Sequence, residues 1–121
     1  ARQKNVYDKL TKTEIIDYLT NNTLNFDYFL AADVFIYIGD LYEVFRLIKK
    51  RNQKIANLVF SIELTTADDY ILEKSGRYSH STNYIRSLCN EFDLTITNFK
   101  KLPIRKEKKQ YISGALYNLS F

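Results

Sequence analysis

The chain has 121 residues, 45% of them hydrophobic, which suits one domain with its own core. Its 18 basic and 14 acidic residues give a net charge of +4, which permits contact with nucleic acid without requiring it. A single cysteine, Cys89, excludes an intrachain disulfide and favours a reducing, cytoplasmic setting. No apolar run reaches the ~18 residues of a membrane span, and no secretory signal is visible.

The first part of the chain is predicted to hold short elements. Residues 1–10 suggest the end of a helix, because Val6 and Leu10 are four positions apart. A short strand is expected within residues 10–16, ending near Glu14, and one helical turn over residues 15–20. The polar residues 21–23 then indicate a loop.

The sequence FDYFLAADVFIYIGDL, at residues 26–41, is the most informative run. Residues 26–33 are nearly all apolar, which is typical of a central parallel strand covered by helices on both faces. Ligands of open α/β sheets sit outside the carboxyl ends of such strands, so Asp33 is predicted to face a ligand.

A helix is predicted to follow this run. Asp40 is a candidate N-cap with Glu43 three residues later, which is the spacing of a capping box. Apolar residues at helical spacing then define one face, and a basic cluster at residues 49–51 suits the helix end. The members of the apolar face are Leu41, Val44, Phe45 and Ile48.

The second half predicts a strand at 54–65, an irregular excursion at 66–79, a helix capped by Ser81, a strand from residue 94 and a last strand at 111–121. Pro103 limits its strand to a sheet edge or a strand end. A charged turn at 105–109 joins the last two strands into an antiparallel hairpin. Alternating strands and helices before it indicate an α/β fold with a parallel sheet.

This order resembles the class I S-adenosylmethionine-dependent methyltransferases, whose Rossmann-like parallel sheet also ends in an antiparallel hairpin. The run at 26–41 is similar to their fourth strand and the following helix start, and NLVFSIE at 57–63 to their fifth strand. SGRYSHS at 75–81 resembles a loop of a bacterial branch often fused to tetratricopeptide repeats. The resemblance covers essentially the whole chain. It implies S-adenosylmethionine as cofactor and methyl transfer to an unidentified acceptor.

Two family features have no counterpart in the chain. It has three glycines and no Gly-x-Gly pattern, and the acidic residue that holds the ribose after strand two is also missing. The resemblance implies that residues 1–121 are the C-terminal portion of one methyltransferase domain, inactive by itself. In the complete fold strands one and two lie between strands three and four. The strand at 26–33 is therefore expected to expose an apolar edge, open to a homodimer or a domain swap.

The resemblance also implies positions for the cofactor. Glu14 would end strand three beside the adenine. A carboxylate there can accept a hydrogen bond from the adenine amino group. Asp33 would lie near the methionine part of the cofactor at the end of strand four, where the small residue Ala32 lets a bulky ligand approach. Each carboxylate also has a plain structural alternative, as a solvated strand end or a loop cap.

Tyr37, Arg77 and Tyr78 are predicted to face the substrate, although aromatic packing explains Tyr37 equally well. His80, the only histidine, is a weak candidate for a general base. One histidine without cysteine or carboxylate partners at ligand spacing predicts no metal site. Methyl transfer is a direct displacement, so no covalent nucleophile is required.

Two other functions remain open at this point. One is a degenerate, non-catalytic methyltransferase-like module that acts through self-association or protein binding. The weaker one is RNA binding by a basic stretch, since such clusters are mostly solvated hairpin tips. Its members are Lys100, Lys101, Arg105, Lys106, Lys108 and Lys109.

Overall fold

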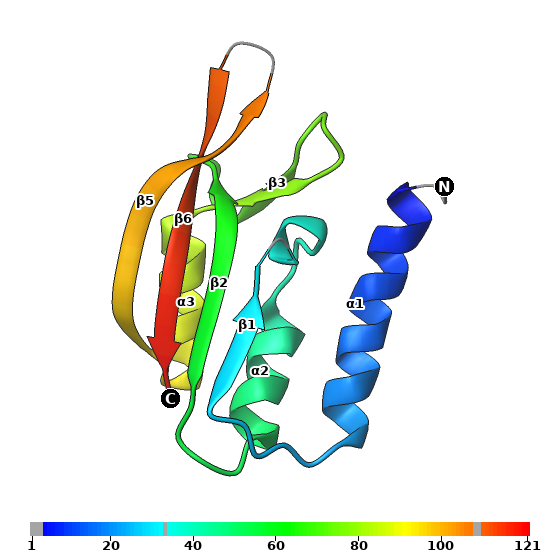
Figure 1. The fold of residues 1–121 in the computed structure, drawn as a ribbon, viewed down its shortest axis with the longest axis vertical. Helices are drawn as coiled ribbons and strands as arrows, with labels where there is room; N and C mark the ends of the chain where they lie inside the picture. Colours follow the sequence, from blue (N-terminus) through cyan, green and yellow to red (C-terminus); the bar gives the residue numbers. More distant parts are fainter. Residues whose placement is uncertain (1–3, 33, 108–109) are drawn as a thin grey trace.

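A computed structural model of the chain describes residues 4–32, 34–107 and 110–121 (Figure 1). Three α-helices, one short 3-10 helix (η1) and six strands make up these residues. In chain order they are α1 (Lys4–Asn21), β1 (Tyr28–Ala31), η1 (Phe35–Tyr37), α2 (Tyr42–Arg51), β2 (Asn57–Leu64), β3 (Tyr70–Leu72), β4 (Tyr78–His80), α3 (Thr82–Phe92), β5 (Thr95–Glu107) and β6 (Gln110–Ser120). None of the helices in this described part is long and apolar enough to cross a membrane.

The strands form one mixed sheet around β2. Along one edge, β6 pairs antiparallel with β2 and β5 pairs antiparallel with β6. Along the other edge, β1 pairs parallel with residues 57–60 and β4 pairs parallel with residues 63–64. The parallel strands followed by an antiparallel hairpin confirm the predicted α/β fold class.

The core lies between the sheet and the helices α2 and α3, which cover the same side of it (Figure 1). Alternate residues of both central strands are buried, as expected for side chains that share one face of the sheet. They are Leu58, Phe60 and Ile62 in β2 and Ala115, Tyr117 and Leu119 in β6. The rings of Phe60 and Tyr117 stack across the two strands with centroids 5.0 Å apart. Phe35 and Phe45 pack on Phe60 from η1 and α2. Burial of this aromatic cluster fixes which face of each strand points inward.

Residues 4–21 form one continuous helix, so the predicted strand at 10–16 is wrong. Ile15 and Leu19, four positions apart, face inward in α1, with Leu19 buried and Ile15 half-buried. Asn21 and Asn22 donate their side-chain amides to the carbonyls of Asp17 and Tyr18 at 2.9 and 2.8 Å, which satisfies the last helical turn. α1 packs against α2 and η1 and makes no strand pair.

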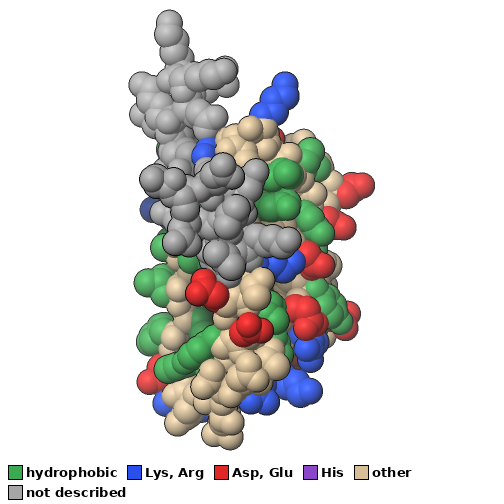
Figure 2. Space-filling model, turned by 90° about the vertical axis from the view of Figure 1, so that its right-hand side faces the viewer, with side chains coloured by type: hydrophobic (Ala, Val, Ile, Leu, Met, Phe, Trp, Pro, Cys, Tyr) green, Lys and Arg blue, Asp and Glu red, His purple; other side chains and the backbone are tan. Residues whose placement is uncertain are grey.

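β1 differs from the predicted strand in length and in burial. It comprises four residues, and its side chains are not buried on both faces. Tyr28 and Leu30 are 68% and 76% exposed, whereas Ala31 is buried on the helix side. Among the described residues, β1 pairs with β2 only, so its other edge has no strand partner. The view onto the α1 side shows hydrophobic side chains exposed among acidic and basic ones (Figure 2).

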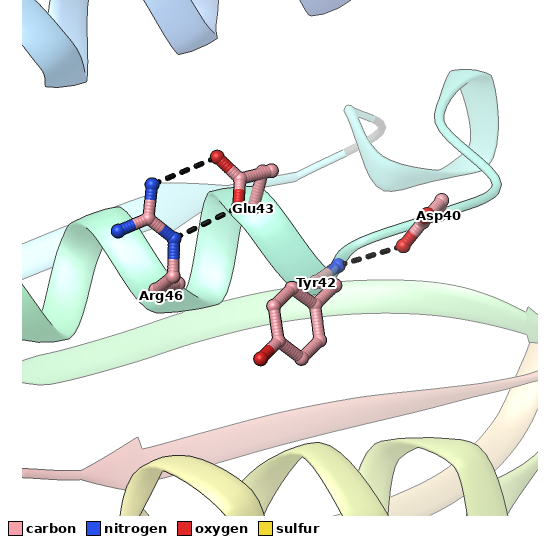
Figure 3. A network of polar contacts seen from close by, with 4 residues as sticks. All are labelled: Asp40, Tyr42, Glu43 and Arg46. Carbon is pink, nitrogen blue, oxygen red and sulfur yellow. Dashed lines mark hydrogen bonds and ion pairs between the residues drawn. The ribbon is translucent and has the colours of Figure 1, made fainter.

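α2 confirms the predicted apolar face but not the predicted capping box. The Asp40 carboxylate accepts a hydrogen bond from the Tyr42 N–H at 3.0 Å (Figure 3). Glu43 does not return a bond to the helix start; it pairs in bidentate fashion with Arg46, at 2.8 and 2.9 Å. This exposed pair follows the helical i, i+3 spacing, so it contributes little to stability.

The excursion predicted as irregular contains the hairpin β3–β4, with Gly76 in a left-handed turn conformation at φ 89°. Ser81 caps α3 as predicted, because its side chain accepts the Tyr84 N–H at 3.0 Å. Pro103 lies inside β5, which is the outer strand of the sheet. The charged turn is shorter than predicted, since β5 continues to Glu107 and β6 begins at Gln110; Lys108 and Lys109 lie outside the described residues.

Candidate functional site

The parallel strands β1, β2 and β4 end at the same edge of the sheet, next to the η1 loop and the hairpin (Figure 1). This is the edge where open α/β sheets bind ligands. α1 contributes to a wall of two cavities. The first, of about 540 Å³, extends along β1, from Phe26 before the strand to Val34 and Phe35 after it. The second, of about 530 Å³, opens at this edge of the sheet.

The first cavity lies between α1 and β1 and is largely apolar. Its lining comprises Glu14, Ile15, Tyr18, Leu19, Phe26, Phe29, Leu30, Ala31, Val34, Phe35, Val44, Ile48 and Leu58. Glu14 is exposed on α1 and is the acidic side chain in this lining. It was predicted at a strand end and lies on a helix instead, yet it shares a cavity with the end of β1.

The other two residues predicted for the cofactor follow β1 directly. Ala32 is exposed just after the strand, beside the cavity-lining residue Ala31. Asp33 lies outside the described residues. The three cofactor assignments, to Glu14, Ala32 and Asp33, therefore stay predictions.

The second cavity lies between α1, the loop after η1 and the β3–β4 hairpin. Its lining comprises Lys12, Thr13, Tyr37, Ile38, Gly39, Asp40, Tyr70, Leu72, Gly76 and Tyr78. Tyr37 and Tyr78, both predicted to face the substrate, are thus brought into one cavity from segments 41 positions apart. Arg77 does not line it.

Arg77 instead fastens the hairpin to β2. Its guanidinium Nε lies 2.9 Å from a carboxylate oxygen of Glu63, with side chains 12% and 2% exposed. Glu63 lies opposite Ser79 in the short pairing between β2 and β4. The ion pair therefore holds the β3–β4 hairpin, which forms one wall of the second cavity, against β2.

Gly39 forms the floor against which the hairpin packs. A Cβ atom at this position would lie 2.6 Å from Cε1 of Tyr78 and 2.8 Å from Cδ2 of Tyr70, far below a normal contact. The absence of a side chain at Gly39 therefore allows both tyrosine rings to approach the loop closely.

His80 joins the same loop to β4 from the inside. The side chain is fully buried, and Nε2 lies 2.9 Å from the carbonyl oxygen of Ile38 and 3.1 Å from that of Gly39. Because both partners are acceptors, Nε2 carries the proton and donates to them. Nδ1 has no hydrogen-bond partner among the residues that the structure describes. Burial lowers the pKa of His80, against the opposite effect of the two backbone bonds.

This geometry suits a neutral imidazole that positions the 38–40 loop. The ring of His80 is enclosed by protein in this structure and does not reach either cavity lining. The general-base role considered for His80 stays a prediction.

Sequence reasoning did not assign Asp40, Tyr70 or Tyr84 to the site. The Asp40 carboxylate accepts the Tyr42 N–H and, at 3.3 Å, the Tyr84 hydroxyl, which itself accepts the Leu41 N–H at 2.9 Å. Burial, and then the charge of Asp40, raise the pKa of Tyr70. The sequence feature that pointed to Tyr70 was an aromatic residue within a polar excursion. Only the pairing of the hairpin strands brings Tyr70 into the same cavity lining as Asp40.

Within the described residues, no group of three or more histidine, cysteine or acidic side chains is arranged to hold a metal ion. Cys89 is buried in α3, and burial raises the pKa of its thiol to about 11.

The fold is that of the class I S-adenosylmethionine-dependent methyltransferases. A methyltransferase of this type from Methanosarcina mazei superposes with a TM-score of 0.64 at 10% identity. The N-methyltransferase NodS from Bradyrhizobium japonicum, in complex with S-adenosylhomocysteine, gives 0.62 at 16% identity, and TehB from Haemophilus influenzae gives 0.60 at 12% identity. No family model and no curated protein matches the chain.

The matches extend over most of this chain but only part of the others. They cover 84%, 88% and 87% of this chain and 63%, 50% and 37% of the M. mazei, NodS and TehB chains, respectively. The chain therefore spans about half the length of these structures.

Replacement of Arg77 by Met is expected to lower the free energy of unfolding by about 3–5 kcal/mol, because the Glu63 carboxylate stays buried without the guanidinium. Urea denaturation at pH 7 measures it. The matched control is Arg46→Met, which removes an exposed pair and should cost below about 1 kcal/mol. A second substitution, Glu63→Gln, should restore part of the stability of Arg77→Met. Equal losses for Arg77→Met and Arg46→Met would contradict the structural role of the buried pair.

Replacement of His80 by Gln is expected to flatten the pH dependence of stability between pH 7.5 and 5.5. The folded-state pKa of His80 is lowered, so the unfolded chain binds more protons as the pH falls below ~6.5. The wild-type chain therefore loses stability on acidification, by at most about 1.4 kcal/mol per pH unit from this group. Because the chain has a single histidine, the difference between the two denaturation series isolates it. Parallel slopes would show that His80 is not buried in its neutral form.

Proposed function

We propose that this chain forms the acceptor side and part of the cofactor side of an S-adenosylmethionine-dependent methyltransferase. The observation that carries the proposal is a pair of cavities that both reach the segment after β1: one extends along β1 to Val34 and Phe35, and the other is lined by residues 37–40. A fold alone does not define an activity. Two cavities that both have α1 in their walls offer separate places for the two reactants of a direct displacement.

In this proposal the cavity between α1 and β1, which Glu14 lines, accepts part of the cofactor. Ala32 and Asp33 are proposed to contact the cofactor. The cavity beneath the hairpin accepts the methyl acceptor, with Tyr37 and Tyr78 in its wall and Arg77 holding that wall in place. Residues 75–81 support placement in the bacterial, tetratricopeptide-associated branch, and the single cysteine supports a cytoplasmic setting.

Methyl transfer by this proposal needs a glycine-rich loop, which is not present in the 121 residues. One edge of β1 pairs with no strand of the described residues, which supports the presence of a further strand on that side in the active enzyme. We propose that residues 1–121 act as the C-terminal portion of one domain and that the isolated chain is inactive.

The test compares S-adenosylhomocysteine binding by the 121-residue chain and by a protein extended upstream in its natural reading frame. Calorimetry is expected to show micromolar binding only for the extended protein, because a glycine-rich loop supplies close backbone contacts. In that protein Asp33→Ala should weaken binding about tenfold or more. Asp27→Ala is the control, since Asp27 pairs with Lys54 at the opposite end of β1. Micromolar binding by the 121 residues alone, or no binding by the extended protein, would contradict the proposal.

The second candidate is a non-catalytic module that acts through association. It is favoured by the exposed side chains of Tyr28 and Leu30 on a strand with an unpaired edge. Both candidates predict that the isolated chain covers this edge by forming a homodimer or a domain swap. Methyl transfer by the extended protein decides between them.

Light scattering of the isolated chain is expected to give a dimer mass at micromolar concentrations. Leu30→Lys should shift it to a monomer, because a charged side chain on an edge strand opposes pairing with another chain. The control is Ile55→Lys, which replaces an equally exposed residue, 80% accessible, in the loop before β2. A wild-type chain that stays monomeric at high concentration would overturn the association.

A further inference from the structure

The cavity beneath the hairpin is walled by aromatic rings. Tyr37 comes from η1, whereas Tyr70 and Tyr78 come from β3 and β4. The rings of Tyr70 and Tyr78 meet edge-to-face with centroids 6.0 Å apart. Neither of these two hydroxyls makes a hydrogen bond with the described part of the chain. The faces of such rings carry negative charge density, which attracts cations.

Asp40 places a carboxylate in the lining of the same cavity. It accepts two hydrogen bonds, from the Tyr42 N–H and the Tyr84 hydroxyl, so its position is fixed. No basic side chain of the described residues lies within ion-pair distance of it. The residue is exposed, and its charge acts on the neighbouring Tyr70. A fixed carboxylate beside aromatic faces is a pairing that suits an ammonium group.

Lys12 of α1 lines the cavity from the other side, and its side chain is exposed. Its positive charge disfavours a ligand with several cationic groups. The cavity volume of about 530 Å³ suits a small organic molecule.

We propose that this cavity binds a small organic monocation, an amine in its ammonium form, against the rings of Tyr70 and Tyr78 and the carboxylate of Asp40. That the amine is also the methyl acceptor rests on the proposed function. In that reaction the ammonium first loses a proton to water. The nitrogen lone pair then forms a bond to the methyl carbon as the bond to the cofactor's sulfonium breaks, which leaves S-adenosylhomocysteine and the methylated ammonium.

The test measures binding to the 121-residue chain without cofactor, which keeps it separate from methyl transfer. Phenethylamine is titrated while the amide NMR signals of residues 39–40 and 70–72 are followed, with the neutral isostere 2-phenylethanol and the polycation spermidine as comparison ligands. Phenethylamine is expected to shift these signals with a dissociation constant at least about tenfold lower than that of 2-phenylethanol. The reason is that only the ammonium group is attracted by the Asp40 carboxylate and the ring faces. Spermidine should bind more weakly than phenethylamine.

Two variants assign the binding to the named groups. Asp40→Asn keeps the hydrogen-bond acceptor for Tyr42 and removes the charge, and should weaken phenethylamine binding about tenfold. The matched control is Asp93→Asn, at the far end of α3, in a left-handed position that Asn tolerates. Tyr70→Phe keeps the ring face and should retain binding, whereas Tyr70→Leu should lose it.

Three results would overturn the proposal: equal affinity for phenethylamine and 2-phenylethanol, an unchanged affinity in Asp40→Asn, or shifts confined to other residues. S-adenosylmethionine, itself an organic cation, is a fourth titrant. Its displacement of phenethylamine from residues 39–40 and 70–72 would assign the cavity to the cofactor and overturn an amine site. Failure of the extended protein to bind S-adenosylhomocysteine would overturn the proposed function and leave amine binding standing.

Discussion

The arrangement of the site depends on how one edge of β2 is divided between two strands. β1 occupies residues 57–60 of that edge and β4 occupies residues 63–64, so β1 ends where β4 begins. The chain leaving β1 must therefore pass the chain of the hairpin. The bonds from Nε2 of His80 to the carbonyls of Ile38 and Gly39 join them, and the two tyrosine rings on Gly39 close the contact. The second cavity is a direct result of this shared edge.

The sequence predicts those parts of the fold whose signal is local. Helix α2 follows from apolar residues at helical spacing, and the start of α3 follows from Ser81, whose side chain caps it as expected. The final hairpin follows from two strands around a charged turn, and Pro103 correctly marks an outer strand. Each of these patterns is settled by neighbours within a few positions of the chain.

The rest depends on pairing between distant segments, which spacing does not encode. Residues 10–16 carry apolar side chains compatible with a strand, but the segment packs as a helix through Ile15 and Leu19. The apolar character of β1 suggested burial on both faces, yet only one face is covered by helices of the described chain. Tyr37 and Tyr78 were assigned to the substrate side separately. Their shared cavity, and the addition of Asp40 and Tyr70 to it, require the register between β3, β4 and β2.

Helix α1 has a consequence for how ligands in the two cavities influence each other. Glu14 and Ile15 line one cavity and the preceding residues Lys12 and Thr13 line the other, so one turn of a single helix is a shared partition. The helix is held by packing on α2 and η1, without strand pairing. A ligand that displaced this turn in one cavity would also reshape the other, and the two affinities would then be thermodynamically linked. Linkage of this kind is reciprocal: each ligand changes the affinity for the other by the same factor.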